Sequence, residues 1–155
     1  MIADLGTPGA LTQDCSAITN AHLKTLMVTR NVGPFSVTGL KPAVEALARV
    51  FTAIKAQKPA LYAALTTAGM TCCCAVRGST TNFSNHSWGT AIDMGIHGVI
   101  VPLGSPTAQE GIAEAAPFFQ AERFFWGAGY STRKDPMHFE ASHELIQAWK
   151  AAGTI

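Results

Sequence analysis

Two short segments of the chain combine the residue types that bind metal ions and move protons. The first runs from Ser84 to Asp93 and contains His86, and the second carries Asp135 three positions before His138. Two imidazoles and one carboxylate form the ligand set of a zinc ion that keeps its fourth position open for water, which is typical of catalytic zinc. The sequence therefore predicts a metal centre built from His86, Asp93 and His138.

Asp135 is the candidate proton carrier of this centre. Pro136 follows it and disfavours helical backbone at Asp135, so this aspartate and His138 do not lie on one helix. We expect Asp135 to reach the centre from a loop that enters a strand. There it would act as a general base toward a metal-activated water and then as a general acid toward a leaving amine.

The elements that must position these residues are short. The clearest is a helix over residues 42–57, because Pro42 suits a first turn and apolar residues follow at three- and four-residue spacing. Further expected helices cover residues 59–68 (ended by Gly69), 107–116 (ended by Pro117) and 142–152 (capped by Ser142), with a short one near 16–27 in an otherwise loop-rich segment 1–40. Expected strands cover 70–76, 91–96, 123–126 and 137–140, with a hairpin through His97-Gly98 to 99–103.

This order of elements predicts the α+β class. Helices come first, and short strands follow with a helix between them, which favours a small, mainly antiparallel sheet with helices packed against it. At 155 residues the chain is expected to be one domain, with a catalytic core over residues 70–145.

The chain is poor in charge, and this excludes several classes of protein. Lys plus Arg number 11 and Asp plus Glu 10, and charged residues make up 14% of the chain, against about 25% in an ordinary domain. There is neither the composition of a disordered chain nor the basic stripe of a nucleic-acid binder. The longest uncharged apolar stretch, 59–76, is interrupted by threonines and a glycine and does not predict a membrane span. Between residues 59 and 109 only Arg77 and Asp93 are charged, and we expect both in one cleft.

The four cysteines give an ambiguous signal. Cys15 stands alone, and Cys72, Cys73 and Cys74 are consecutive. A disulfide framework or a zinc ribbon would space its cysteines differently. The triplet is therefore predicted to be small, buried side chains on a strand.

The two motifs together resemble a known family of enzymes. The sequence carries Ser-x-His-x-x-Gly-x-Ala-x-Asp at Ser84, His86, Gly89, Ala91 and Asp93, followed by Asp-x-x-His at Asp135 and His138. This pattern resembles the zinc D-alanyl-D-alanine carboxypeptidase and L-alanyl-D-glutamate endopeptidase family, which includes vancomycin-resistance dipeptidases and several phage endolysins. Arg77 and Trp126-Gly127 also stand where the family carries an arginine and an aromatic-Gly step, so the resemblance covers about residues 70–145.

The resemblance implies a Hedgehog/DD-peptidase-like fold and roles for individual residues. His86, Asp93 and His138 would bind Zn2+, and Asp135 would be the catalytic acid/base. Arg77 would stabilise the tetrahedral oxyanion or clamp a substrate carbonyl or carboxylate, and Ser84 would help to hold the substrate. The implied substrate is a peptidoglycan stem peptide. Because many relatives carry Glu at the position of Asp135, the aspartate favours the endopeptidase and endolysin branch.

Several alternatives stay open at this point. The same chemistry would serve a D-alanyl-D-alanine carboxypeptidase, and a non-catalytic zinc-binding recognition module is the alternative of another class. Glu140 and Trp88 are candidates to orient the side chains of the metal ligands through contacts outside the ligand set. Alternatively, Glu140 lies at the solvated end of a strand, and Trp88 packs in the core. His97 is either a cleft or surface histidine or a rival metal ligand.

The expected place of action conflicts with the start of the chain. Peptidoglycan lies outside the cytoplasmic membrane, yet residues 1–8 lack the basic and apolar regions of a signal peptide. We expect action on the cell wall, in the periplasm or outside the cell. Release through a phage holin, a secretion system or excision from a longer exported protein would each account for this. We also expect a monomer with no nucleic-acid partner.

Overall fold

The computed structural model describes residues 1–155 and has the predicted α+β architecture. The helices are α1 (Ile2–Leu5), α2 (Ala21–Thr25), α3 (Lys41–Gln57), α4 (Pro59–Ala64), α5 (Glu110–Ala121) and α6 (His143–Ala151), with 3-10 turns η1 (Asn85–Trp88) and η2 (Gly127–Gly129). The strands are β1 (Met27–Asn31), β2 (Ser36–Leu40), β3 (Leu65–Gly69), β4 (Ala91–Ile96), β5 (Phe124–Trp126) and β6 (His138–Ala141). None of the helices combines the length and apolar character needed to cross a membrane.

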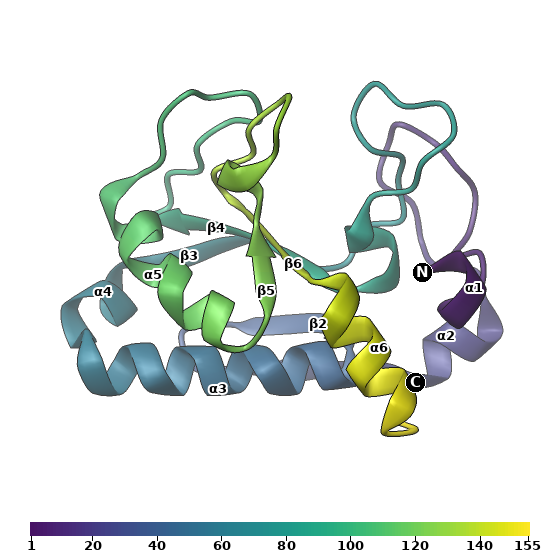
Figure 1. Cartoon of the computed structure of the whole chain (residues 1–155), viewed down its shortest axis with the longest axis horizontal. Coiled ribbons are helices and arrows are strands. Elements are labelled where there is room, and N and C mark those ends of the chain that lie inside the picture. The colour runs from purple at the N-terminus through teal and green to yellow at the C-terminus, as the bar shows by residue number, and fades with distance from the viewer.

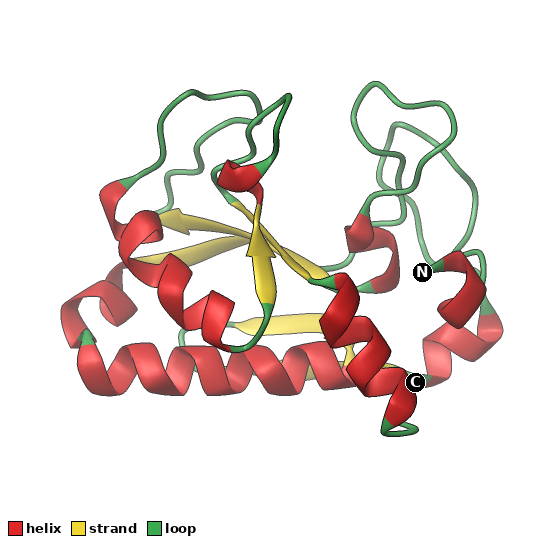
Figure 2. Cartoon of the chain, in the orientation of Figure 1, coloured by secondary structure: helices red, strands yellow, loops and turns green.

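The strands form two antiparallel sheets. The larger has the order β3-β4-β6-β5, and β1 and β2 form a separate hairpin. Helix α3 runs along one side of the molecule, and Figure 2 shows long loops gathered on the opposite side of the larger sheet (Figure 1). The sheet therefore separates a helical layer from a layer of loops.

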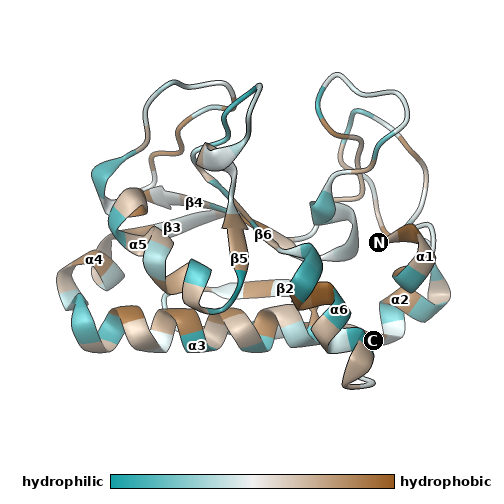
Figure 3. Cartoon of the chain, viewed as in Figure 1, coloured by the Kyte–Doolittle hydropathy of each residue, from teal (hydrophilic) through white to brown (hydrophobic).

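The hydrophobic core lies between α3, α5 and the larger sheet. Apolar residues recur along α3 (Figure 3), and its inward side chains, Val44, Leu47, Val50, Phe51 and Ile54, are at most 1% exposed. From α5, the ring of Phe119 stacks on that of Phe139 in β6, with centroids 4.0 Å apart. Burial of apolar side chains is the main favourable term in folding, so this contact stabilises the packing of β6 against α5.

Alternation along β4 and β6 separates core residues from polar ones. Ile92 and Phe139 are fully buried on the core face, and they pair in register. The next pair in the ladder is Asp93 and His138, whose side chains point to the other face because successive strand residues alternate. The register of one antiparallel pair thus places two polar residues side by side beneath the loops.

Several predicted elements are confirmed. The long helix begins at Lys41 and ends at Gln57, β4 spans the predicted 91–96, and β5 and β6 lie within one or two residues of their predicted bounds. Ser142 caps α6 by accepting a hydrogen bond from the backbone N–H of Leu145.

The prediction for the N-terminal segment is wrong in part, because residues 1–40 contain the β1–β2 hairpin. Helix α2 does fall within the predicted 16–27 region. The hairpin escaped prediction because β1 is largely exposed along its length and shows no apolar alternation. Residues 37–40, which lie in the segment expected to be loop-rich, belong to β2.

The prediction for residues 59–76 is also wrong. The second helix ends at Ala64, and residues 65–69 form β3, since pairing with β4 outweighs their weak helical pattern. Residues 70–76 form no strand, and the only β-bridges in this segment are isolated ones at Cys73 and Ala75.

Two further elements differ from expectation. After β4 the chain turns at His97 and Gly98, but only one bridge, Ile96 to Val99, follows, so 99–103 is not a strand. Pro117 lies inside α5 rather than at its end. The helix continues across it because Ala116 and Phe119 on either side are buried against the core.

The cysteines are not the simple buried set that the sequence predicts. Cys15 and Cys72 form a disulfide, while Cys73 is a buried free thiol and Cys74 a partly exposed one. The bond links two residues that are 57 positions apart and ties the N-terminal segment to Cys72, whose backbone N–H donates to the carbonyl of His86.

Candidate metal centre

Three predicted ligands converge on one point above the sheet. His86 comes from η1, Asp93 from β4 and His138 from β6. Nε2 of His86 lies 3.2 Å from Nδ1 of His138, and Oδ1 of Asp93 lies 3.0 Å from Nδ1 of His138 and 3.2 Å from Nε2 of His86. These three atoms come from segments that only the folded chain brings together.

The chemistry of this cluster fits a zinc ion. A tetrahedral ion with bonds of about 2.0–2.1 Å to nitrogen and oxygen separates its ligand atoms by roughly 3.3 Å, close to the spacing here. The outer nitrogens are already engaged, since Nδ1 of His86 donates to the carbonyl of Met70 (2.9 Å) and Nε2 of His138 donates to Glu140 (3.1 Å). Such contacts fix the tautomers of metal-binding histidines and leave the inner nitrogens free as ligands.

Local backbone chemistry explains how His86 is held. Ser84 caps η1, its Oγ accepting from the backbone N–H of His86 at 3.4 Å. Gly89 ends the turn in the left-handed region (φ 62°), and a Cβ there would lie 2.7 Å from Cα of Gly39. Ser84 and Gly89 of the motif therefore both stabilise the turn that carries His86. Ser84 also lines the cavity.

The cysteine segment supports the same turn. The backbone N–H of Cys72 donates to the carbonyl of His86 (3.1 Å), and that of Ser84 donates to the carbonyl of Cys74 (2.9 Å). The hydroxyl of buried Ser87 donates to the carbonyl of Cys74 (2.9 Å). Residues 72–74 thus act as a brace for the histidine turn.

Electrostatics within the cluster favour a carboxylate facing charged imidazole. Burial alone would raise the pKa of Asp93, but hydrogen bonds from His138 and His86 outweigh it and hold the pKa well below its usual value. Burial likewise opposes charge on His138, yet its hydrogen bonds to Asp93 and Glu140 raise its pKa to about 9. The metal-free cluster therefore keeps a proton that an incoming metal ion must displace.

Asp135 lines a cavity of about 560 Å³ together with the three ligand residues. Its Oδ1 is buried and has no hydrogen-bond partner, and burial, followed by the charge of Asp93, raises its pKa against the opposing effect of the histidines. The loop is held by Trp126, whose indole donates to the carbonyl of Pro136 (2.9 Å). A Cβ at Gly127 would lie 2.5 Å from the carbonyl of Asp135, so this close approach needs glycine.

Arg77 is exposed and lines the same cavity as Asp93, as expected from the charge pattern. Arg133, which the sequence did not single out, lines it too and donates from its guanidinium to the carbonyl of Arg77. Neither arginine is in a salt bridge. Two unpaired guanidinium groups therefore lie at the rim.

The supporting residues divide into those that reach the centre and those that do not. Glu140 reaches it, since its Oε2 contacts His138 and accepts from Nδ2 of Asn85 at 2.6 Å. Trp88 does not, because it is 3% exposed in the core and its indole donates to the carbonyl of Gly6. His97 lies exposed in the turn after β4, outside the cluster.

Asn85 and Tyr130 complete the surroundings of Glu140. The sequence did not single out Asn85 as a site residue. Burial, reinforced by the charges of Glu140 and Asp135, raises the pKa of Tyr130, so its phenol stays protonated as a hydrogen-bond donor. A local signal existed for Asn85 only in its place beside His86.

Comparison with known proteins agrees with this geometry. Residues 77–141 match the family model described as D-alanyl-D-alanine carboxypeptidase. This segment contains Arg77, the three ligand residues, Asp135 and Glu140. No curated protein and no solved structure matches the chain significantly. The match covers less than half of the chain, and together with the His/Asp/His cluster that could bind a metal ion it supports a hydrolase of the peptidase type.

Proposed function

We propose that the chain is a zinc-dependent peptidase that hydrolyses peptidoglycan stem peptides at the cell wall. One observation carries this proposal: the ligand atoms of His86, Asp93 and His138 converge in the same cavity as the buried, unpaired Oδ1 of Asp135. A pure recognition module would need the ligands but not the buried carboxylate.

Each residue then has a defined task. When bound, zinc polarises the scissile carbonyl and lowers the pKa of water. Asp135 accepts the proton of the attacking water and returns it to the leaving amine, and burial, which raises its pKa, makes it a stronger base for the first step. Arg77 faces the negative charge that develops on the carbonyl oxygen.

The shape of the cleft supports cleavage within a peptide chain. A second cavity of about 410 Å³ adjoins the first, and the two share Asn85, Tyr130 and Glu140. Space on both sides of the metal centre suits a substrate that continues in both directions, as an L-alanyl-D-glutamate endopeptidase requires. We therefore favour the bond between L-alanine and D-glutamate as the one that is cleaved.

One observation favours the second candidate, a D-alanyl-D-alanine carboxypeptidase. Arg77 and Arg133 have no carboxylate partner within the protein, and paired guanidinium groups bind carboxylates well. They would hold the terminal carboxylate of an exopeptidase substrate.

Digestion of purified muropeptides tests these proposals. Zinc-loaded protein should release stem peptides cut after L-alanine, as detected by mass spectrometry, and chelation should abolish release. The Asp93→Asn variant should lose activity and bound zinc, whereas the control His97→Ala should keep both. Free D-alanine as the sole product would favour the carboxypeptidase, and the absence of any product with zinc bound would favour the recognition module.

A further inference from the structure

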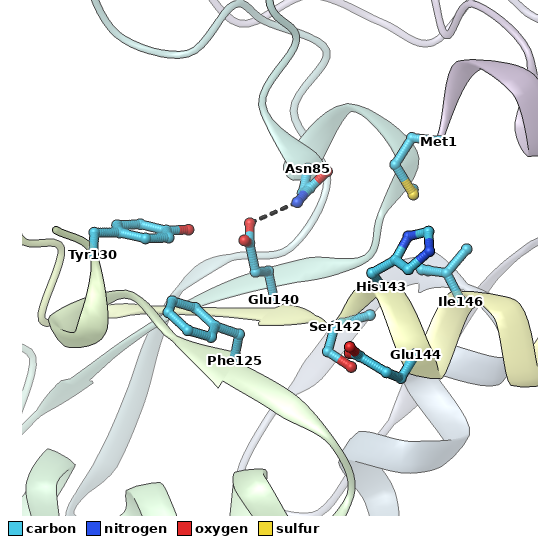
Figure 4. Close-up of a pocket in the computed structure, with 10 residues that line it drawn as sticks. Met1, Asn85, Phe125, Tyr130, Glu140, Ser142, His143, Glu144 and Ile146 are labelled. Atoms are coloured by element: carbon cyan, nitrogen blue, oxygen red, sulfur yellow. Dashed lines mark hydrogen bonds between the residues drawn. The ribbon is translucent and has the colours of Figure 1, made fainter. Parts of the chain in front are cut away.

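The second cavity lies directly beside the metal centre. Glu140 lines both cavities; its Oε2 contacts His138 of the metal centre, and Figure 4 shows its hydrogen bond with Asn85 at the edge of the second cavity. A substrate held at the centre would therefore extend past Glu140 into this space.

One side of this cavity is aromatic. Phe125 is 40% exposed, and it is the one aromatic residue among the exposed large hydrophobic side chains. Its ring stacks on Tyr130, with centroids 5.3 Å apart and planes inclined by 25°. Exposing an apolar ring to water is unfavourable, and here it stands at the mouth of a cavity beside the reaction centre. The stacked pair offers a rigid, flat apolar surface.

The rest of the lining combines polar side chains, mostly from the start of α6, with the apolar residues Met1, Ala141 and Ile146. Figure 4 shows Ser142, His143 and Glu144 across the cavity from Tyr130, with Asn85 and Glu140 between. His143 and Glu144 are exposed and form no salt bridge with each other. An aliphatic side chain would leave these hydrogen-bonding groups without partners. A flat ring with an apolar face and a polar edge would satisfy both kinds of lining.

We propose that this cavity binds the N-acetylated sugar that precedes the stem peptide in peptidoglycan. The inference rests on the proposed function, since a sugar lies next to the scissile bond only if cleavage follows the first residue of the stem. The C–H face of the ring would lie on Phe125, and its hydroxyl and acetamido groups would contact the polar residues of α6. The volume of about 410 Å³ suits one such ring.

Kinetics on paired substrates test the subsite. One substrate is the disaccharide-linked stem peptide, and the other is the same peptide acetylated at its N-terminus in place of the sugar. We expect kcat/KM to be about tenfold higher for the sugar-linked substrate, which corresponds to about 1.4 kcal/mol of additional transition-state binding. Equal rates would overturn the subsite while leaving the peptidase intact, and hydrolysis of neither would overturn the proposed function.

Variants of Phe125 identify the surface responsible. Phe125→Ala should lose most of the preference for the sugar, so the ratio of kcat/KM between the two substrates should fall toward one. Phe125→Trp should retain the preference. Val99→Ala is the matched control, since Val99 is 60% exposed and lines neither cavity. An equal loss on both substrates in Phe125→Ala would contradict a sugar-specific role.

A binding experiment tests the subsite without catalysis. N-acetylmuramoyl-L-alanine added to the metal-free protein should shift the NMR resonances of Phe125 and His143, and acetyl-L-alanine should not. Shifts confined to the Arg77 side of the cleft, or none at millimolar ligand, would overturn the proposal.

Discussion

Nε2 of His138 lies 3.1 Å from Oε2 of Glu140, two residues further along the same strand. Strand residues two apart share a face, so this contact is built into β6. It leaves Nδ1 of His138 directed at Asp93 and His86. The strand therefore supplies both a proposed metal ligand, His138, and the carboxylate that would orient it, Glu140.

Replacing Glu140 with Gln should weaken metal binding by about 10- to 100-fold, which is typical for loss of a carboxylate behind a histidine ligand. The amide cannot hold the Nε2 proton of His138 as strongly. Isothermal titration with zinc measures the change. Glu144→Gln makes the same substitution away from the ligands and should leave the affinity unchanged, so equal losses in the two variants would argue against an orienting role.

Asp135→Asn should lower kcat by about 10²–10⁴-fold, the usual contribution of a general acid–base. Zinc content should stay at the wild-type level, because Asp135 is not in the ligand cluster. Steady-state kinetics and metal analysis on the same sample separate the two effects. Asp14→Asn, an exposed aspartate, serves as the control, and a fully active Asp135→Asn would refute the assigned role.

Arg77 and Arg133 should differ in kinetic effect. Arg77→Ala should lower kcat by about 10²-fold, since donors to developing charge act in the transition state. Arg133→Ala should mainly raise KM, by about tenfold, because this guanidinium would hold ground-state substrate. Lys134→Ala removes a neighbouring charge that lines neither cavity and should change neither constant. Identical effects of the two arginines on kcat would contradict this division.

The metal-free protein should lose stability as the pH rises from 6.5 to 9. The pKa of His138 is raised from 6.5 to about 9 in the folded state, so the folded protein binds the proton more tightly than the unfolded chain. The stabilisation is full below pH 6.5 and is lost by pH 9, with a size on the order of 3 kcal/mol. Urea denaturation across this range measures it.

The same pH series on His138→Gln isolates this residue. The variant lacks the titrating imidazole, so its stability should not decline in this window through that group. A wild-type decline that persists unchanged in His138→Gln would show that another group is responsible.

Removing the disulfide should destabilise the protein by about 2–4 kcal/mol, because the bond closes a long loop in the unfolded chain. Reduction of the wild type and the double variant Cys15→Ala/Cys72→Ala should give the same loss in urea denaturation. The double variant should then be insensitive to reductant. Zinc affinity should also fall, since residues 72–74 brace the turn that carries His86. A reductant effect in the double variant would implicate Cys73 or Cys74 instead.

The sequence by itself determined the candidate site residues and the strongest local elements. His86, Asp93, Asp135 and His138 could be named because their types and spacing express the chemistry directly. The helix over 41–57 could be predicted because its apolar residues repeat at helical spacing over several turns. The cap of α6 by Ser142 could be predicted because a helix cap depends on a hydrogen bond between neighbouring residues.

Only the tertiary structure decided which distant residues meet. Residues 65–69 became a strand because β4 offered a partner, and Cys15 joined Cys72 across 57 positions. Arg133 reached the cleft because its loop folds back beside Arg77. The register that sets Asp93 opposite His138 depends on the packing of Phe139 beneath the sheet. Such contacts join residues that are far apart in the chain. The local sequence around each residue therefore contains no pattern from which these contacts could be predicted.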